Sequence, residues 1–221
     1  MSEALRILVT GFGPFPRAPF NPTIPLVARL TRLRRPALDD VTLIGHIFDV
    51  TYQTVDRELP DLVAKVRPHA LLMFGLATRT SHLRVEMRAR NAVNTRMPDA
   101  EGHLAKKASI IHGADAKPFG PHTMNLLQAA LATGIDARLS RDAGTYLCNY
   151  LSWRAIEATQ QAGGPALASF IHIPPIAQDG TARRAMSDIT LEQLVDAGEA
   201  VLMEMVKRTR HALVSLSSSA H

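Results

Sequence analysis

A strand–helix–strand pattern between residues 135 and 173 most constrains the fold of this chain. Residues 135–140 are predicted to form a short strand, and residues 166–173 are an apolar run of strand length closed by two prolines. Residues 146–161 carry apolar residues at three- and four-residue spacing, which predicts a helix that ends at Gly163-Gly164. In a βαβ unit the two strands are parallel, and their carboxyl ends share one edge of the sheet. The pattern therefore predicts an α/β fold.

The single cysteine of the chain, Cys148, falls in the first turn of this predicted helix. A turn at Asp142-Ala143-Gly144 precedes it, and Thr145 is a candidate helix cap. Unpaired backbone N–H groups and the helix dipole favour a thiolate at this position. His172 ends the second strand, so the pattern predicts thiol and imidazole on one edge, as a nucleophile and its base require. Each residue alone would more often belong to the core, but their common edge favours a Cys–His site.

Composition limits the class of protein. A chain of 221 residues suits one domain, which we expect over 1–214 with a frayed tail over 215–221. Apolar runs fall short of the roughly 18 residues of a membrane span, and a single cysteine and a start without a leader predict a cytoplasmic protein. The basic residues behind the net charge of +5 are scattered and aromatic residues make up only 5%, so no nucleic-acid partner is expected. Histidine and cysteine spacing predicts no metal and no cofactor.

The amino-terminal strand, residues 5–10, leads into the loop Gly11-Phe12-Gly13-Pro14-Phe15. Pro16 stands where a dinucleotide-binding loop needs its third glycine, so that interpretation is weak. Phe12 and Phe15 are either core anchors or the walls of an apolar pocket for a small flat ligand.

Residues 83–90 alternate between apolar and charged side chains, which predicts a strand with one wet face. Glu86 lies in its charged row, and the pattern alone favours a cross-strand ion pair for it. The remaining prediction comprises strands over 41–48 and 70–74, helices over 25–34, 54–66, 123–133 and 191–213, and irregular segments over 93–121 and 177–186.

Three segments together resemble the pyroglutamyl peptidase I (pyrrolidone carboxyl peptidase) family of cysteine exopeptidases. Residues 142–149 with 170–174 match its cysteine and histidine motifs, residues 11–15 with 21–23 its amino-terminal signature, and residues 75–91 the segment that carries its catalytic glutamate. The resemblance implies a three-layer α/β/α sandwich around a mixed, mostly parallel twisted sheet. It also implies a homo-oligomer, a tetramer or a dimer.

For the site, the resemblance implies a triad of Cys148, His172 and Glu86 that removes a pyroglutamyl residue from a peptide with a blocked amino terminus. It implies that Phe12, Phe15 and Tyr146 enclose the lactam ring. The sequence departs from the family where many members have Gln after the strand-end Gly, a Gly-Gly-Arg run and Arg after the catalytic Glu. Two alternatives therefore stay open, an amidase or peptidase of different acyl specificity and a catalytically silent binding homologue. The departing positions are Leu76, Thr78-Arg79-Thr80 and Met87.

Overall fold

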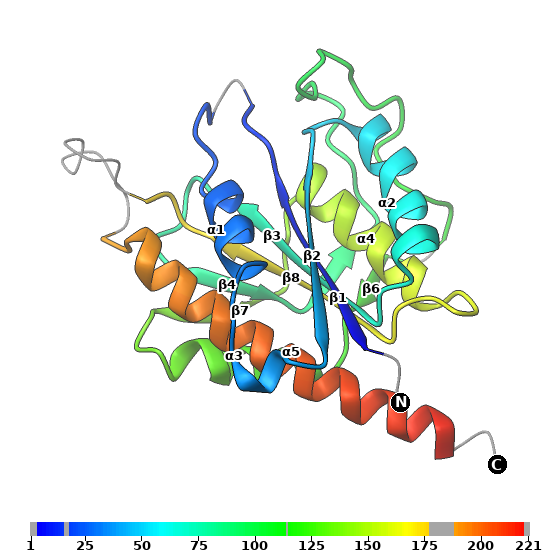
Figure 1. Cartoon of the computed structure of the whole chain (residues 1–221). Helices are drawn as coiled ribbons and strands as arrows, with labels where there is room; N and C mark the ends of the chain where they lie inside the picture. Colours follow the sequence, from blue (N-terminus) through cyan, green and yellow to red (C-terminus); the bar gives the residue numbers. More distant parts are fainter. Residues whose placement is uncertain (1–3, 16–17, 114, 177–187, 219–221) are drawn as a thin grey trace.

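A six-stranded sheet organises the molecule (Figure 1). The computed structural model describes residues 4–15, 18–113, 115–176 and 188–218. The strand order is β2-β1-β3-β8-β4-β7, and every neighbouring pair is parallel except β4 and β8. The predicted mixed, mostly parallel sheet is therefore confirmed. Its strands are β1 (Leu5–Phe12), β2 (Val41–Phe48), β3 (Ala70–Leu76), β4 (Leu83–Glu86), β7 (Ala137–Ser140) and β8 (Leu167–Ile173).

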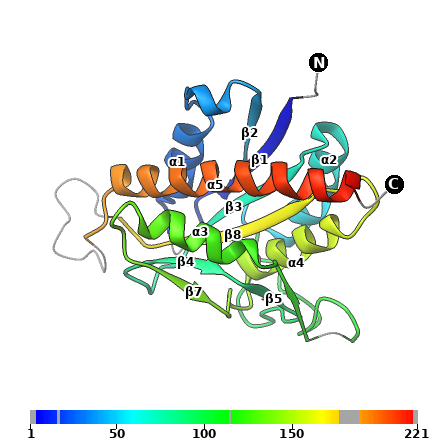
Figure 2. The same cartoon turned by 90° about the horizontal axis from the view of Figure 1, so that it is seen from below.

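Helices cover both faces of this sheet, which gives the predicted α/β/α sandwich. Alternate residues of the strands point to opposite faces, so each face has its own apolar core. Figure 2 shows α5 crossing one face between α1 and α3, and α2 and α4 pack on the other. The helices are α1 (Thr23–Leu30), α2 (Tyr52–Val66), α3 (His122–Leu131), α4 (Leu147–Thr159) and α5 (Leu191–Ser218).

The direction of β7 corrects one prediction. Because β7 is parallel to β4 and β4 is antiparallel to β8, β7 and β8 run in opposite directions rather than as the strands of a βαβ unit. Helix α4 leads directly into β8 and packs on it, so its first turn lies near the carboxyl end of β8. Cys148 thus reaches His172 through the position of α4, and not because β7 and β8 share an edge.

The predicted strand over 83–90 is divided at Met87. Its first half is β4 of the main sheet, while β5 (Arg88–Arg90) pairs with β6 (Ala116–Pro118) in a separate two-stranded sheet. The Met87 N–H donates to the Ser140 carbonyl at 2.7 Å, and its own carbonyl accepts from the Phe119 N–H at 2.9 Å. Met87 thus bonds to the main sheet through its N–H and to the segment of β6 through its carbonyl, so the chain passes from one sheet to the other at this residue.

Two predicted helix boundaries need correction, the amino-terminal cap of α4 and the carboxyl end of α5. Tyr146, not Thr145, is the amino-terminal cap of α4, and it makes no side-chain capping bond. Helix α5 continues to Ser218, beyond the predicted domain end at 214, and residues 219–221 and 177–187 lie outside the described residues. Thr190 does cap α5, because its Oγ1 accepts from the Gln193 N–H at 3.2 Å.

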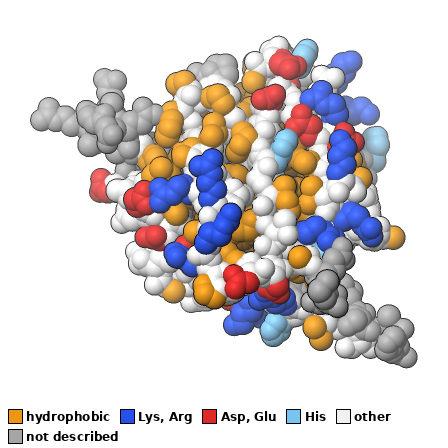
Figure 3. Space-filling model, viewed as in Figure 1, with side chains coloured by type: hydrophobic (Ala, Val, Ile, Leu, Met, Phe, Trp, Pro, Cys, Tyr) orange, Lys and Arg blue, Asp and Glu red, His pale blue; other side chains and the backbone are white. Residues whose placement is uncertain are grey.

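The described helices include none long and apolar enough to cross a membrane. On the face seen in Figure 3, basic and acidic side chains lie interspersed rather than in a single basic block. This mixture agrees with the scattered basic residues of the sequence.

Candidate functional site

Glu86 and His172 meet on the face of the sheet that α4 covers. Antiparallel β4 and β8 place Arg84 opposite His172, and Glu86 lies two residues further on the same face. The Glu86 Oε1 atom accepts a hydrogen bond from His172 Nδ1 at 2.7 Å. The Glu86 side chain is fully buried and that of His172 is 6% exposed. The predicted wet face is therefore wrong at Glu86, because the carboxylate contacts Arg84 and His172 and its side chain is closed off from solvent.

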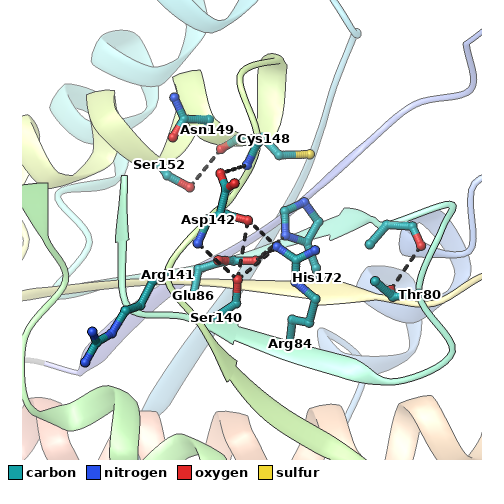
Figure 4. Close-up of polar contacts among 12 residues, drawn as sticks. Thr80, Arg84, Glu86, Ser140, Arg141, Asp142, Cys148, Asn149, Ser152 and His172 are labelled. Carbon is teal, nitrogen blue, oxygen red and sulfur yellow. Dashed lines mark hydrogen bonds and ion pairs between the residues drawn. The ribbon is translucent and has the colours of Figure 1, made fainter. Parts of the chain in front are cut away.

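Cys148 occupies the first turn of α4, beside His172 (Figure 4). Gly75 lies near the carboxyl end of β3, in register with His172. A Cβ atom on Gly75 would lie 2.8 Å from Cys148 Sγ and 2.6 Å from the ring of Phe170. Only glycine therefore lets the thiol approach the sheet this closely.

The charges of this group support one another. Burial lowers the pKa of His172, but the charge and hydrogen bond of Cys148 and the hydrogen bond to Glu86 outweigh burial and raise it to about 9. Burial raises the pKa of Glu86, yet the hydrogen bond and charge of His172 and the charge of Arg84 hold it below its usual range. At neutral pH these interactions favour an imidazolium between the Glu86 carboxylate and the Cys148 sulfur.

Asn149, which the sequence did not single out, joins α4 to the glutamate segment. Its Nδ2 atom donates to the carbonyls of Arg90 and Ala92 at 2.8 and 2.9 Å, and its Oδ1 accepts from the Arg90 N–H at 2.8 Å. The side chain is fully buried. Its place directly after the cysteine, in the first turn of the helix, is the signal that points to this role.

The three aromatic residues predicted to bind the substrate lie on the same face as Cys148. Phe12 is only 3% exposed and packs on Phe48 with ring centroids 6.1 Å apart, so it is a core anchor. Phe15 and Tyr146 are partly buried at the margin of that core. The Tyr146 hydroxyl donates to the Pro98 carbonyl at 2.9 Å, which ties the start of α4 to the irregular connection over 93–121.

Several charged groups lie around the site, but they do not form a metal centre. Among the residues that the structure describes, no three His, Cys, Asp or Glu side chains gather as metal ligands would. The polar contacts are instead hydrogen bonds and ion pairs between the chain's own side chains and backbone. This arrangement suits nucleophilic and acid–base chemistry by side chains.

Comparison with known proteins gives one family. A model described as pyroglutamyl peptidase matches residues 5–208. The pyrrolidone-carboxylate peptidase of Pyrococcus furiosus is 30% identical over 173 residues, 78% of this chain and 82% of its own. That of Thermococcus onnurineus is 30% identical over 204 residues, 92% and 100% of the two chains. A pyrrolidone carboxyl peptidase structure from Fervidobacterium islandicum superposes with a TM-score of 0.82 at 27% identity, over 92% of this chain and 99% of that one.

Proposed function

The chain belongs to the pyroglutamyl peptidase family, and we propose that Cys148, His172 and Glu86 are the triad with which it removes an amino-terminal pyroglutamyl residue. The observation that carries the proposal is the buried contact of 2.7 Å between Glu86 and His172, whose imidazole also interacts with Cys148. A carboxylate, an imidazole and a thiol in this order are what a cysteine peptidase needs.

In the first half of the reaction, Cys148 Sγ attacks the amide carbonyl that follows the pyroglutamyl residue. His172 carries the thiol proton and donates it to the departing amine, which leaves a thioester on Cys148. Water then attacks the thioester with His172 as base, which releases pyroglutamate and restores the thiol. Glu86 holds the Nδ1 proton, fixes the tautomer and stabilises the imidazolium.

The developing oxyanion needs hydrogen-bond donors close to Cys148. The first backbone N–H groups of α4 have no acceptor within the helix, and they lie at the positive end of the helix dipole. We assign these N–H groups to the oxyanion because they belong to the same helical turn as the nucleophile.

Recognition of the lactam falls to Phe15 and Tyr146 at the margin of the α2/α4 core, with Phe12 buried behind them. Leu76 replaces an amide side chain that many family members have, so any polar contact at this position comes from its backbone carbonyl, which can accept the lactam N–H. Apolar walls and one carbonyl acceptor suit a neutral five-membered lactam better than a charged amino terminus.

The test is turnover of a fluorogenic pyroglutamyl amide by the reduced, purified chain. We expect turnover by the wild type, and Cys148→Ala should reduce it to background, a loss of about 10⁶-fold when a nucleophile is removed. The matching prolyl amide, which has the ring without the lactam carbonyl, is the control substrate. Faster cleavage of the prolyl amide would replace the proposed substrate class, and turnover retained by Cys148→Ala would remove the assigned nucleophile.

Two further properties belong to the same proposal, a homo-oligomeric state and a cytoplasmic location. Family resemblance supports the first, and the single cysteine, which the mechanism needs reduced, supports the second. Light scattering should give a mass that is a multiple of 24.1 kDa, with a monomer as the contrary result. Fractionation of expressing cells should recover the activity with cytoplasmic markers.

A further inference from the structure

Arg84 lies beside the site without a role in the mechanism above. We propose that Arg84 is a positioning residue that holds the Glu86 carboxylate against His172 and ties it to the loop leading to Cys148. This inference rests on the proposed function, because it concerns how the triad is held.

The first argument is the way in which the carboxylate is held. Arg84 and Glu86 are two residues apart on β4 and share a face, and Arg84 Nη2 lies 2.7 Å from Glu86 Oε1. The same oxygen accepts from His172 Nδ1. Glu86 Oε2 is buried and has no hydrogen-bond partner among the described residues. Two donors that hold the carboxylate, His172 and Arg84, thus meet at one oxygen, and a side-chain hydrogen bond from Ser140 also lowers the pKa of Glu86. Arg84 is the charged donor that does not take part in proton transfer.

The second argument is what else the guanidinium contacts. Arg84 Nη2 donates to Ser140 Oγ at 2.9 Å and also to the Asp142 carbonyl (Figure 4). Ser140 ends β7, and Asp142 lies in the loop between β7 and α4, the helix that carries the thiol. All three contacts are made by one nitrogen, Nη2, which thus joins the glutamate strand to the segment that positions Cys148.

The third argument is charge. The ionisable groups around His172 are Cys148 from α4, Glu86 and Arg84 from β4, and Asp142 from the loop, whose carboxylate is paired with Arg90 at 2.9 Å. The positive charge of Arg84, which is paired with Glu86, disfavours protonation of the neighbouring groups. Arg84 therefore keeps His172 from binding its proton too tightly, so that the proton can pass to the leaving amine.

Arg88 provides a matched control. It lies in the same charged row, and its Nε donates to the Arg141 carbonyl at 2.9 Å, on the same loop. It makes no described contact with Glu86. Arg88→Met therefore removes an arginine that clamps this loop, without touching the triad.

The experiment compares Arg84→Met, Arg84→Lys and Arg88→Met in the full chain. We expect Arg84→Met to lower kcat about 10- to 100-fold at nearly unchanged KM, as a small misplacement of a catalytic group does. It should also move the His172 titration midpoint, followed by NMR and assigned with His172→Gln, to higher pH. Arg84→Lys should restore the midpoint because it keeps the charge, while kcat stays reduced because the shorter lysine side chain does not reach the three acceptors that Arg84 Nη2 holds. Arg88→Met should match the wild type in both readouts.

Wild-type kcat and an unmoved midpoint in Arg84→Met would overturn the inference. A loss of kcat shared with Arg88→Met and without a midpoint shift would show a loop clamp instead, which also overturns it. If Arg84→Met does not fold, Arg84→Lys decides alone, since wild-type kcat in that variant contradicts a need for the arginine side chain. The NMR midpoint requires no substrate, so a shifted midpoint in a protein that cleaves no pyroglutamyl amide would overturn the proposed function and leave the positioning role standing.

Discussion

Among the described residues, two histidine–carboxylate pairs have nearly equal lengths and lie in different surroundings. His172 and Glu86 are 2.7 Å apart with side chains 6% and 0% exposed. His46 of β2 and Glu58 of α2 are 2.8 Å apart with side chains 25% and 27% exposed. The two distances are almost the same, whereas the exposed fractions of the side chains differ several-fold. The distance between the two groups therefore does not by itself identify a catalytic site.

What separates the pairs is the third partner of each. Glu58 also accepts from Arg57, and although burial raises its pKa, the hydrogen bonds from Arg57 and His46 hold the pKa below its usual range. Water reaches that pair and screens it. His172 instead faces Cys148 in a buried position, where an electrostatic interaction is stronger. The same two residue types therefore give a surface ion pair in one place and a candidate catalytic pair in the other.

The largest expected difference between the pairs is in turnover after loss of the carboxylate charge. Glu86→Gln keeps size and packing but cannot stabilise imidazolium, so kcat should fall by about 10²- to 10⁴-fold. Glu58→Gln, the matched change at the surface pair, should leave kcat at the wild-type level. Equal kcat in the two variants would reduce the triad to a Cys148–His172 dyad.

The next largest effect should come from moving the thiol without touching the buried pair. Gly75→Ala places a methyl group 2.8 Å from Cys148 Sγ and against the Phe170 ring, so Sγ must shift and kcat should fall by up to about 100-fold. Stability should fall by about 1–3 kcal/mol, as overpacking does.

Gly45→Ala is the control for that change. Its added Cβ would lie 3.2 Å from a Thr31 methyl group, so it crowds the sheet at a distance from the thiol. It should lower the denaturation midpoint and leave kcat unchanged. A similar loss of kcat in both variants would mean that general crowding of the sheet, and not the position of Sγ, limits turnover.

A smaller and directional effect concerns pH. His172 must be protonated to serve the leaving amine, so kcat/KM should fall as the pH rises through about 9. Glu86→Gln removes a negative charge that raises the pKa of His172, so the alkaline limb should move to lower pH. His46→Gln should leave the limb in place. A limb that moves upward in Glu86→Gln would contradict the assignment of the raised pKa to this pair.

The residues of the candidate site were easier to predict than the topology that joins them. The turn at Gly144, which adopts a φ of +82°, the helix that carries Cys148 and the strand that carries His172 depend on local patterns. The antiparallel direction of β8 against β4 depends on pairing between distant segments, which local patterns do not encode. The family resemblance was correct, and it led to the right fold although the βαβ argument behind the common edge was wrong.

The burial of Glu86 could not be predicted from the alternating pattern for a related reason. Alternation shows that Arg84 and Glu86 share a face, but whether protein or solvent covers that face depends on tertiary packing. Glycine at position 75 is likewise explained by tertiary neighbours, the sulfur atom of Cys148 and the ring of Phe170. These residues acquire their roles from tertiary contacts, and the sequence identified Glu86 only through the resemblance.

The smallest expected effect is on stability at the surface pair. Glu58→Gln should cost about 0–1 kcal/mol of unfolding free energy near neutral pH, because both side chains are about a quarter exposed and solvent screens the pair. The pKa of Glu58 is lower in the folded state than its usual 4.5, so its charge stabilises the fold above that value, and this contribution disappears as the pH falls through the folded pKa. Urea denaturation at pH 7 and at pH 3 should therefore show a difference between variant and wild type that shrinks in acid. A cost of several kcal/mol at pH 7 would mean that the surface pair is as tightly coupled as the buried one, which would remove the contrast between them.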